Sequence, residues 1–207
     1  MMSKKIIITF EGIEGSGKSL HIQNVSKYLK KKKISFIKIR EPGGSKNAEK
    51  IRKLILSNKS KFNKNTDLLL YMASRSENVE NIIKKNYKKK VILIDRFTDS
   101  TIAYQHYGMG IDKKIIKLIN NYLLKKISVG FTFLHIVNKK NLKHRLLKRK
   151  VLNRYDKFKN SFYEKIQKGY INQANLRKKK YLIINSNIKI NMNKKIILNK
   201  ISKILNI

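Results

Sequence analysis

The clearest candidate for chemistry is a glycine-rich run that ends in lysine and serine, "GIEGSGKS". It follows an apolar stretch and precedes a helical pattern, which is the context that a phosphate-binding loop requires. Glycines let backbone N–H groups converge on phosphate oxygens, while Lys18 can reach a transferred phosphate and the Ser19 hydroxyl can hold Mg²⁺. We predict that the whole loop binds nucleotide phosphates: Gly12, Ile13, Glu14, Gly15, Ser16, Gly17, Lys18 and Ser19.

A carboxylate and a guanidinium stand together at the end of another apolar run, "VILID" followed by arginine. At the end of a parallel strand the Asp95 carboxylate can reach a metal ion, often through water, although solvated aspartates also occur there. Arg96 presents a cation to anions at the same edge. Ser19 and Asp95 are therefore the predicted metal ligands, with Mg²⁺ as the cofactor.

These groups need a sheet that brings the strand ends together, and the sequence has the pattern for one. Short apolar runs alternate with amphipathic stretches, which is typical of a parallel sheet covered by helices, and the runs are apolar enough for burial on both faces. Strands are predicted at 5–10, 35–39, 91–95, 131–137 and 181–185. Helices are predicted near 18–32, 46–57, 66–86, 98–106, 112–126, 139–149, 157–178 and 193–206.

The composition excludes several other chemistries. The chain has 207 residues and no cysteine, so it forms no disulfide and no thiolate metal site. Only five apolar or threonine residues lie between "MMSKK" and Glu11, too few for a signal peptide or a membrane span. We therefore expect a single cytoplasmic domain, residues 1–207, with no membrane partner.

The charge is extreme, with 50 lysines and arginines against 12 acidic residues and a formal net charge of +38. Such a chain can bind nucleic acid by releasing counterions from phosphates. The lysines are spread along the whole chain, however, and no nucleic-acid-binding motif accompanies them, which favours a coding bias. We predict no specific nucleic-acid partner.

The phosphate loop alone is compatible with GTPases, helicases, transporters and kinases. The absence of an NKxD element disfavours a GTPase, and four further motifs narrow the field: "REPGG" (40–44), "LLLYMASR" (68–75), "DRFTDSTIAYQ" (95–105) and "NRYDKFKNSFYEKIQKGY" (153–170). Together with the loop, and in this order along nearly the whole chain, they resemble the bacterial thymidylate kinases.

The resemblance implies a fold and a reaction. The fold is the three-layer α/β/α P-loop kinase fold, with a five-stranded parallel sheet and a basic lid near 148–160. The reaction is Mg²⁺-dependent transfer of the γ-phosphate of ATP to dTMP, giving dTDP for dTTP synthesis, usually in a homodimer. Two alternatives stay open: another nucleoside or nucleotide monophosphate kinase, and a basic nucleic-acid-binding ATPase.

The resemblance also assigns the acceptor site. Tyr71 and Arg75 share a helix face at a spacing of four, where the ring can stack on thymine and the guanidinium can donate to its O4. Thr101 is implied near the thymine N3–H, and Tyr104 where it crowds a ribose 2′-hydroxyl. The residues expected to contact dTMP are Glu14, Arg40, Pro42, Tyr71, Arg75, Arg96, Ser100, Thr101, Tyr104 and Gln105.

Catalysis of phosphoryl transfer needs cations against the moving phosphate. The family's other subgroup has an arginine where this chain has Gly15, so the lid has to supply one. Arg145, Arg149 and Arg154 match lid arginines, although a solvated basic loop is the alternative. The expected catalytic residues are Lys18, Arg96, Arg149 and Arg154, with Arg145 on the ATP. Two family positions differ here, an aspartate that is Asn153 and an arginine that is Gln167.

Overall fold

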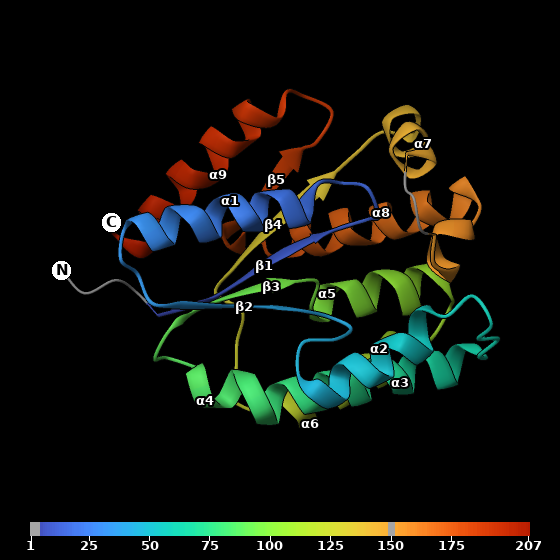
Figure 1. Cartoon of the computed structure of the whole chain (residues 1–207). Helices are drawn as coiled ribbons and strands as arrows, with labels where there is room; N and C mark the ends of the chain where they lie inside the picture. Colours follow the sequence, from blue (N-terminus) through green and yellow to red (C-terminus); the bar gives the residue numbers. More distant parts are fainter. Residues whose placement is uncertain (1–4, 149–151) are drawn as a thin grey trace.

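The five predicted strands form one parallel sheet. A computed structural model describes residues 5–148 and 152–207, and its strand order is β2-β3-β1-β4-β5 (Figure 1). All four neighbouring pairs are parallel, which confirms the predicted α/β architecture. The strands are β1 (Ile7–Gly12), β2 (Phe36–Arg40), β3 (Val91–Asp95), β4 (Phe131–Ile136) and β5 (Tyr181–Asn185).

Helices cover both faces of this sheet, as the P-loop kinase fold requires. The α-helices are α1 (Lys18–Lys31), α2 (Lys46–Leu56), α3 (Lys64–Asn78), α4 (Lys84–Asn86), α5 (Thr98–Thr101), α6 (Lys113–Leu124), α7 (Lys139–Leu147), α8 (Asn160–Leu176) and α9 (Ile190–Leu205). Shorter turns are the π-helices η1 (Val79–Ile83) and η2 (Ile102–Gly108), and the 3₁₀ helices η3 (Arg154–Lys157) and η4 (Lys178–Lys180).

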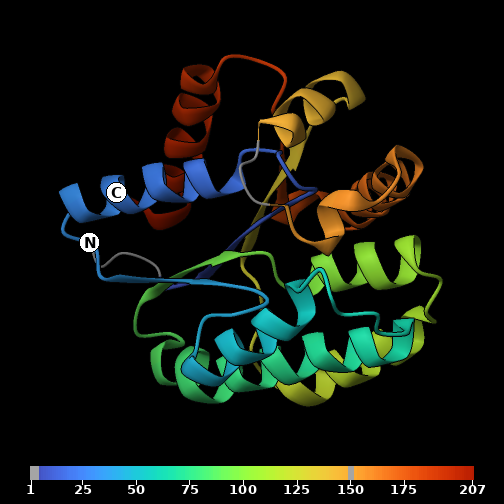
Figure 2. The same cartoon turned by 45° about the vertical axis from the view of Figure 1, so that its right-hand side comes forward.

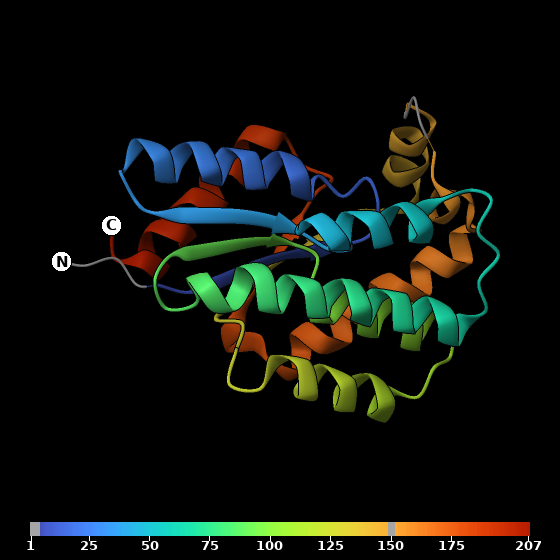
Figure 3. The ribbon, with the colours of Figure 1, turned by 60° about the horizontal axis from the view of Figure 1, so that its bottom comes forward.

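The strand side chains are buried alternately on the two faces. On one face Ile8, Phe10 and Leu93 pack beneath α1 and α9, whose Val25 and Ile201 are fully buried. On the other face a second cluster joins the sheet to η1 and to the segment between α6 and β4, and α2, α3 and α6 lie on that side (Figures 2 and 3). Burial on both faces explains why the strands are almost uninterrupted runs of apolar residues.

Two predicted helices are less regular than their sequence patterns suggest. The segment predicted as one helix over 66–86 is α3, the π-helix η1 and the short α4 in succession. The segment predicted as a helix over 98–106 has only four α-helical residues before η2 begins. Apolar periodicity does not distinguish an α-helix from one widened by a π turn, because both place one apolar side inward.

Across residues 5–148 and 152–207, no helix combines the length and the apolar character needed to cross a membrane.

Candidate active site

A large cavity opens at the carboxyl edge of the sheet, where β1, β2 and β3 end. Its volume is about 780 Å³, within the range of small-molecule sites. In open parallel sheets this edge is the usual position of a ligand site. Most of the predicted site residues line it: Glu14, Gly15, Gly17, Lys18, Ser19, Arg40, Pro42, Tyr71, Arg75, Asp95, Arg96, Ser100, Thr101, Tyr104 and Gln105.

The phosphate loop takes its shape from close packing against β4. Gly12 ends β1 with a φ of +136°, and a Cβ there would lie 2.2 Å from the backbone oxygen of His135. Gly17 has a φ of 87° and caps the N-terminus of α1. Ile13 and Ser16 are buried beneath the loop, so they shape it and do not line the cavity. The loop therefore presents its backbone and the positive end of α1 to the cavity.

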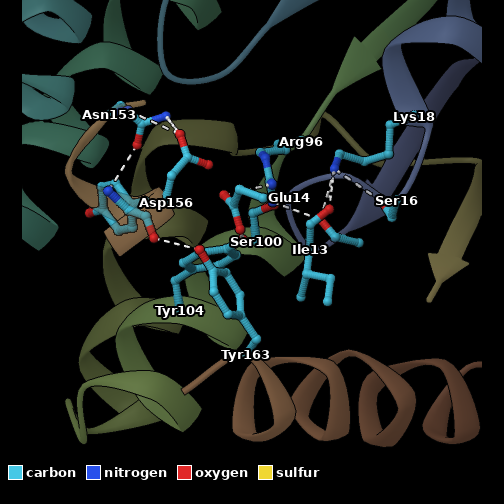
Figure 4. A network of polar contacts seen from close by, with 12 residues as sticks. Ile13, Glu14, Ser16, Lys18, Arg96, Ser100, Tyr104, Asn153, Asp156 and Tyr163 are labelled. Atoms are coloured by element: carbon cyan, nitrogen blue, oxygen red, sulfur yellow. Dashed lines mark hydrogen bonds and ion pairs between the residues drawn. The ribbon is translucent and has the colours of Figure 1, made fainter. Parts of the chain in front are cut away.

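The Lys18 ammonium lies within the loop that it follows. Its Nζ donates to the carbonyl oxygens of Gly12 at 3.0 Å and Ile13 at 2.8 Å, and lies 3.3 Å from Ser16 Oγ (Figure 4). Burial, together with the neighbouring charge of Arg96, lowers the pKa of Lys18 to about 7. When a phosphate binds here, Lys18 can donate to anionic phosphate oxygens in place of the neutral carbonyl oxygens. The negative charge of the phosphate would then raise the pKa of Lys18 again.

The predicted metal ligands lie together beside this loop. The Ser19 hydroxyl donates to Asp95 Oδ2 at 2.8 Å, at the junction of α1 with the end of β3. A hydroxyl and a carboxylate are oxygen donors suited to Mg²⁺, which usually takes one or two protein ligands and completes its shell with water and phosphate oxygens. Within the described residues no group of three or more His, Cys, Asp or Glu could hold a metal. The site therefore fits an ion that arrives with a phosphate ligand.

Glu14 connects the loop to the predicted acceptor groups. Its carboxylate accepts from Arg96 Nη2 at 2.9 Å and from the Tyr104 hydroxyl at 2.5 Å (Figure 4). Burial alone would raise the pKa of Glu14, but the charges of Arg96 and Lys18 hold it below its usual value. Arg96 also donates to the Gly12 carbonyl at 2.8 Å, and its Cζ lies 5.1 Å from the centre of the Tyr104 ring. The guanidinium is thus fixed at the centre of the cavity.

Glu11, which the sequence analysis did not select, holds the segment that carries Arg96. Its carboxylate accepts from the Phe97 N–H at 2.8 Å and from the Ser100 hydroxyl at 2.6 Å. The Ser100 hydroxyl also lies 2.6 Å from the hydroxyl of Tyr170 on α8. Burial, together with the charge of Asp99, raises the pKa of Glu11 to about 7. Arg96 itself has a φ of 66°, which these contacts stabilise.

The far end of the cavity has the groups predicted to meet a base. Tyr71 of α3 lines it and makes an edge contact with Tyr155 at 6.2 Å between ring centres. Thr101 is buried, and its hydroxyl has no hydrogen-bond partner among the described residues. Gln105 lies on η2 rather than on a regular helix, yet it lines the cavity with Thr101. A buried hydroxyl without a partner is a ready group for a ligand.

Arg75 lines this end of the cavity but is almost completely buried, with 1% of its surface exposed. Its Nε donates to Glu41 Oε2 at 2.8 Å, and its Nη2 lies 2.7 Å from the same oxygen. Its Nη1 donates to Asn120 Oδ1 at 2.6 Å. Residue type alone favours a surface position for an arginine on a helix; here the buried carboxylate of Glu41 neutralises it.

The wall formed by "REPGG" has a different arrangement from the predicted one. Arg40 pairs with Glu49 at 2.9 Å and is 55% exposed, so in this structure it faces α2. Arg52 of α2 donates to the Pro42 carbonyl at 2.6 Å and lines the cavity. No sequence signal marks Arg52, because one arginine among 50 basic residues is distinguished only by the packing of α2 against Pro42.

The three lid arginines lie in different places. Arg145 of α7 donates to the carbonyl oxygens of Gly15 at 2.9 Å and Ser186 at 2.6 Å, on the outer side of the phosphate loop. Arg154 pairs with Asp67 of α3 and is not among the residues that line the cavity. It would have to leave Asp67 to reach a transferring phosphate. Arg149 lies outside the described residues.

The two positions that differ from the family pattern have local partners. The Asn153 side chain caps η3. The Asp156 carboxylate accepts hydrogen bonds from the Asn153 backbone N–H at 3.0 Å and from Asn153 Nδ2 at 2.7 Å (Figure 4). The Gln167 amide accepts from the N–H of Val137 at 3.0 Å and donates to its carbonyl at 3.1 Å. Both residues hold backbone in place around the site; Asn153 also lines the cavity, whereas Gln167 does not.

Known proteins are similar to this chain in both sequence and fold. The family model described as "Thymidylate kinase" matches residues 10–197. A thymidylate kinase of Thermosipho africanus is 38% identical over 179 residues, which are 86% of this chain and 89% of that protein. One of Acholeplasma laidlawii is 37% identical over 201 residues, covering 96% and 99% of the two chains. The crystal structure of a thymidylate kinase from Ehrlichia chaffeensis superposes with a TM-score of 0.78 at 28% identity, over 96% of this chain and 99% of that one.

Proposed function

The chain belongs to the thymidylate kinase family and transfers the γ-phosphate of ATP to dTMP; from this premise we propose which of its residues perform each part. One observation supports the assignment most strongly. The phosphate loop, the Ser19–Asp95 pair and the Glu14–Arg96–Tyr104 group line one cavity, so two nucleotides can meet there with their phosphates facing each other.

The donor nucleotide occupies the loop side of the cavity. Backbone N–H groups of the loop take the ATP phosphates, and Lys18 moves from the carbonyls of Gly12 and Ile13 to the β- and γ-phosphate oxygens. Ser19 and Asp95 hold Mg²⁺, which neutralises charge on those phosphates when it is bound. Arg145, which already contacts Gly15, covers the donor from α7.

The acceptor nucleotide occupies the other side. Arg96 binds the dTMP phosphate, and Glu14 accepts a hydrogen bond from the sugar, with Tyr104 excluding a ribose 2′-hydroxyl. Tyr71 stacks on thymine, while Arg75, Thr101 and Gln105 meet its polar edge; Arg40, Pro42 and Ser100 complete the wall. The Thr101 hydroxyl, which has no hydrogen-bond partner among the described residues, supports this arrangement.

The reaction needs alignment and neutralisation of charge more than covalent chemistry by the protein. Lys18 contacts the moving phosphate from the donor side of the cavity, and Arg96 contacts it from the acceptor side. We assign the remaining cation to Arg149 or Arg154 of the lid. For Arg154 this requires breaking its ion pair with Asp67, so we propose that η3, which carries Arg154, moves during the cycle. Closure of such a segment also excludes water.

We propose further that the protein is one domain and that it forms a homodimer through α6. Ile115, Leu118 and Tyr122 of α6 share one side and are 49%, 71% and 75% exposed. Leu69 of α3, a helix that lies beside α6 (Figure 3), is 58% exposed. Exposed large apolar side chains that gather on one side of a helix mark an interface. A cytoplasmic location stays a prediction.

The dimer is tested by light scattering after size-exclusion chromatography. Leu118→Glu places a charge in the apolar surface and should convert dimers to monomers. Leu176→Glu is the matched control, because Leu176 is 75% exposed on a different helix, α8. Monomeric wild-type protein, or a Leu118→Glu variant that stays dimeric, would contradict the proposed interface.

The donor assignment is tested by Lys18→Ala. It should abolish dTDP formation, with a loss of at least about 10³-fold expected for removal of a cation on the transferred group. Lys27→Ala, on an exposed side of the same helix, should keep normal activity. Near-normal turnover by Lys18→Ala would refute the role of this lysine.

A further inference from the structure

Asn120 contacts Arg75 from an element that otherwise does not reach the cavity. No cavity-lining residue comes from α6, yet the Asn120 side chain extends from that helix to Arg75 Nη1 at 2.6 Å. Asn120 is 6% exposed and Arg75 is 1% exposed, so water does not compete at this contact. A hydrogen bond between an ionised donor and a buried amide is among the stronger polar contacts in a protein.

The chemistry of the two side chains fixes the orientation of the amide. Arginine has N–H donors and no acceptor, so only Oδ1 of Asn120 can face it. Glu41 takes the N–H groups of Nε and Nη2 through one oxygen, at 2.8 and 2.7 Å. A carboxylate that binds through one oxygen still allows the guanidinium to pivot about it. Asn120 holds the third nitrogen and removes that freedom.

Two further contacts limit what else could orient Arg75. The Arg75 Cζ lies 5.1 Å from the centre of the Phe97 ring, which restrains the plane of the guanidinium but not its rotation within that plane. The Met72 sulfur lies 3.8 Å from Nη1 and is a weak acceptor. Among the described residues, Asn120 is therefore the strong acceptor that sets the direction in which the other N–H groups of Nη1 and Nη2 point.

We propose that Asn120 is a positioning residue for base selection: it fixes Arg75 so that the guanidinium meets the carbonyl edge of the acceptor base at the right angle. This rests on the proposed function, in which Arg75 reads that edge. Asn120 touches neither nucleotide and acts only through Arg75. Base selection is thereby linked to α6, the helix that carries the exposed apolar side.

The test is steady-state kinetics of Asn120→Leu, which keeps the size of the side chain and removes the acceptor. The base contact is made in the ground state and in the transition state, so its loss should raise KM and leave kcat nearly unchanged. We expect KM for dTMP to rise about 5- to 30-fold, the range that a single buried hydrogen bond supports, with KM for ATP within about twofold. Asn120→Asp keeps an acceptor oxygen and should restore most of the affinity. Asn121→Ala, exposed on the same helix, should change nothing.

A double-mutant cycle separates positioning from a merely structural role. Arg75→Lys keeps a cation for Glu41 but lacks the nitrogen that Asn120 holds. If Asn120 acts only through Arg75, adding Asn120→Leu to Arg75→Lys should raise KM for dTMP no further. Should Asn120→Leu not fold, Asn120→Ser replaces it in the same cycle.

The outcomes distinguish this inference from the function on which it rests. If Arg75→Lys keeps the full preference for dTMP over dCMP, the proposal that Arg75 selects the acceptor base is wrong. If Arg75→Lys loses that preference but Asn120→Leu leaves KM for dTMP unchanged, the positioning role fails alone. An Asn120→Leu variant whose KM for ATP and kcat change as much as its KM for dTMP has a structural defect, and this too overturns the proposal.

Discussion

Replacing Arg75 by methionine tests how the buried charges beneath the base site are balanced. Arg75→Met keeps much of the length of the side chain but leaves Glu41 without its cation. The two side chains are 1% and 4% exposed, and their nitrogen–oxygen distances are 2.8 and 2.7 Å. Removing one partner of a buried pair typically destabilises a protein by about 3–5 kcal/mol. For a chain of this size that corresponds to a fall in Tm of roughly 6–20 °C.

The pH dependence of this loss follows from Glu41. Burial raises the pKa of Glu41, while the charge and hydrogen bonds of Arg75 oppose the rise. Without Arg75 the pKa moves further above its unfolded value, so the folded protein binds the Glu41 proton more tightly than the unfolded chain does. The resulting stability is present at low pH and is lost as pH rises through the folded pKa. Arg75→Met should therefore be more destabilised, relative to wild type, at pH 8 than at pH 5.

Chemical denaturation of wild type, Arg75→Met, Glu41→Gln and Arg75→Met/Glu41→Gln at both pH values measures these effects. The double variant removes the uncompensated charge, so it should recover part of the stability and lose the added pH dependence. The reasoning is refuted if Arg75→Met is as stable as wild type at pH 8. It is also refuted if the effects of the two substitutions simply add, since contacting partners should be coupled.

Three further predictions concern the phosphate loop and the charge of the chain. Because burial lowers the pKa of Lys18 to about 7, ATP binding at pH 8 should take up close to one proton, and affinity should fall as pH rises above 7. Calorimetry in buffers of different ionisation enthalpy measures the uptake; equal heats in all buffers would contradict it. Gly12→Ala places a Cβ 2.2 Å from a backbone oxygen, so this variant should lose activity and more than about 2 kcal/mol of stability. Gly110 also has a positive φ, but a Cβ there would meet open space. Gly110→Ala should therefore lose about 1 kcal/mol of stability and keep its activity. Equal thermal shifts for the two alanine variants would count against the close packing. With a net charge of +38 and no acidic residue from 165 to 207, the protein should melt at higher temperature in 0.3 M than in 0.03 M NaCl, and a flat or falling series would show that self-repulsion is unimportant.

The sequence predicts the sheet better than it predicts the side-chain network of the site. Strands buried on both faces are runs of Ile, Leu and Val, and their ends lie within a residue or two of the predicted ones. The phosphate loop depends on local geometry, and Gly12, Lys18 and Ser19 lie where such a loop requires. Both features are decided by residues close together in the chain.

The missed features depend on contacts between residues far apart in the chain. Glu11, Arg52 and Asn120 each act on a partner more than 40 residues away or on another element, and no local pattern marks them. Residue type suggested a surface position for Arg75, which is buried because Glu41 meets it from a separate loop. Arg154 was expected at the phosphates and pairs with Asp67, because an ion pair between the lid and α3 cannot be inferred from the spacing of either motif.

The most direct test of the account is product formation by the purified protein with ATP, Mg²⁺ and a panel of acceptors, dTMP, dUMP, dCMP, dGMP and dAMP, with Lys18→Ala as the inactive control. We expect dTDP as the dominant product, with kcat/KM for dTMP above that for every other monophosphate and no product from the control. Preferential phosphorylation of another acceptor, or dTDP formation that persists without Lys18, would contradict it.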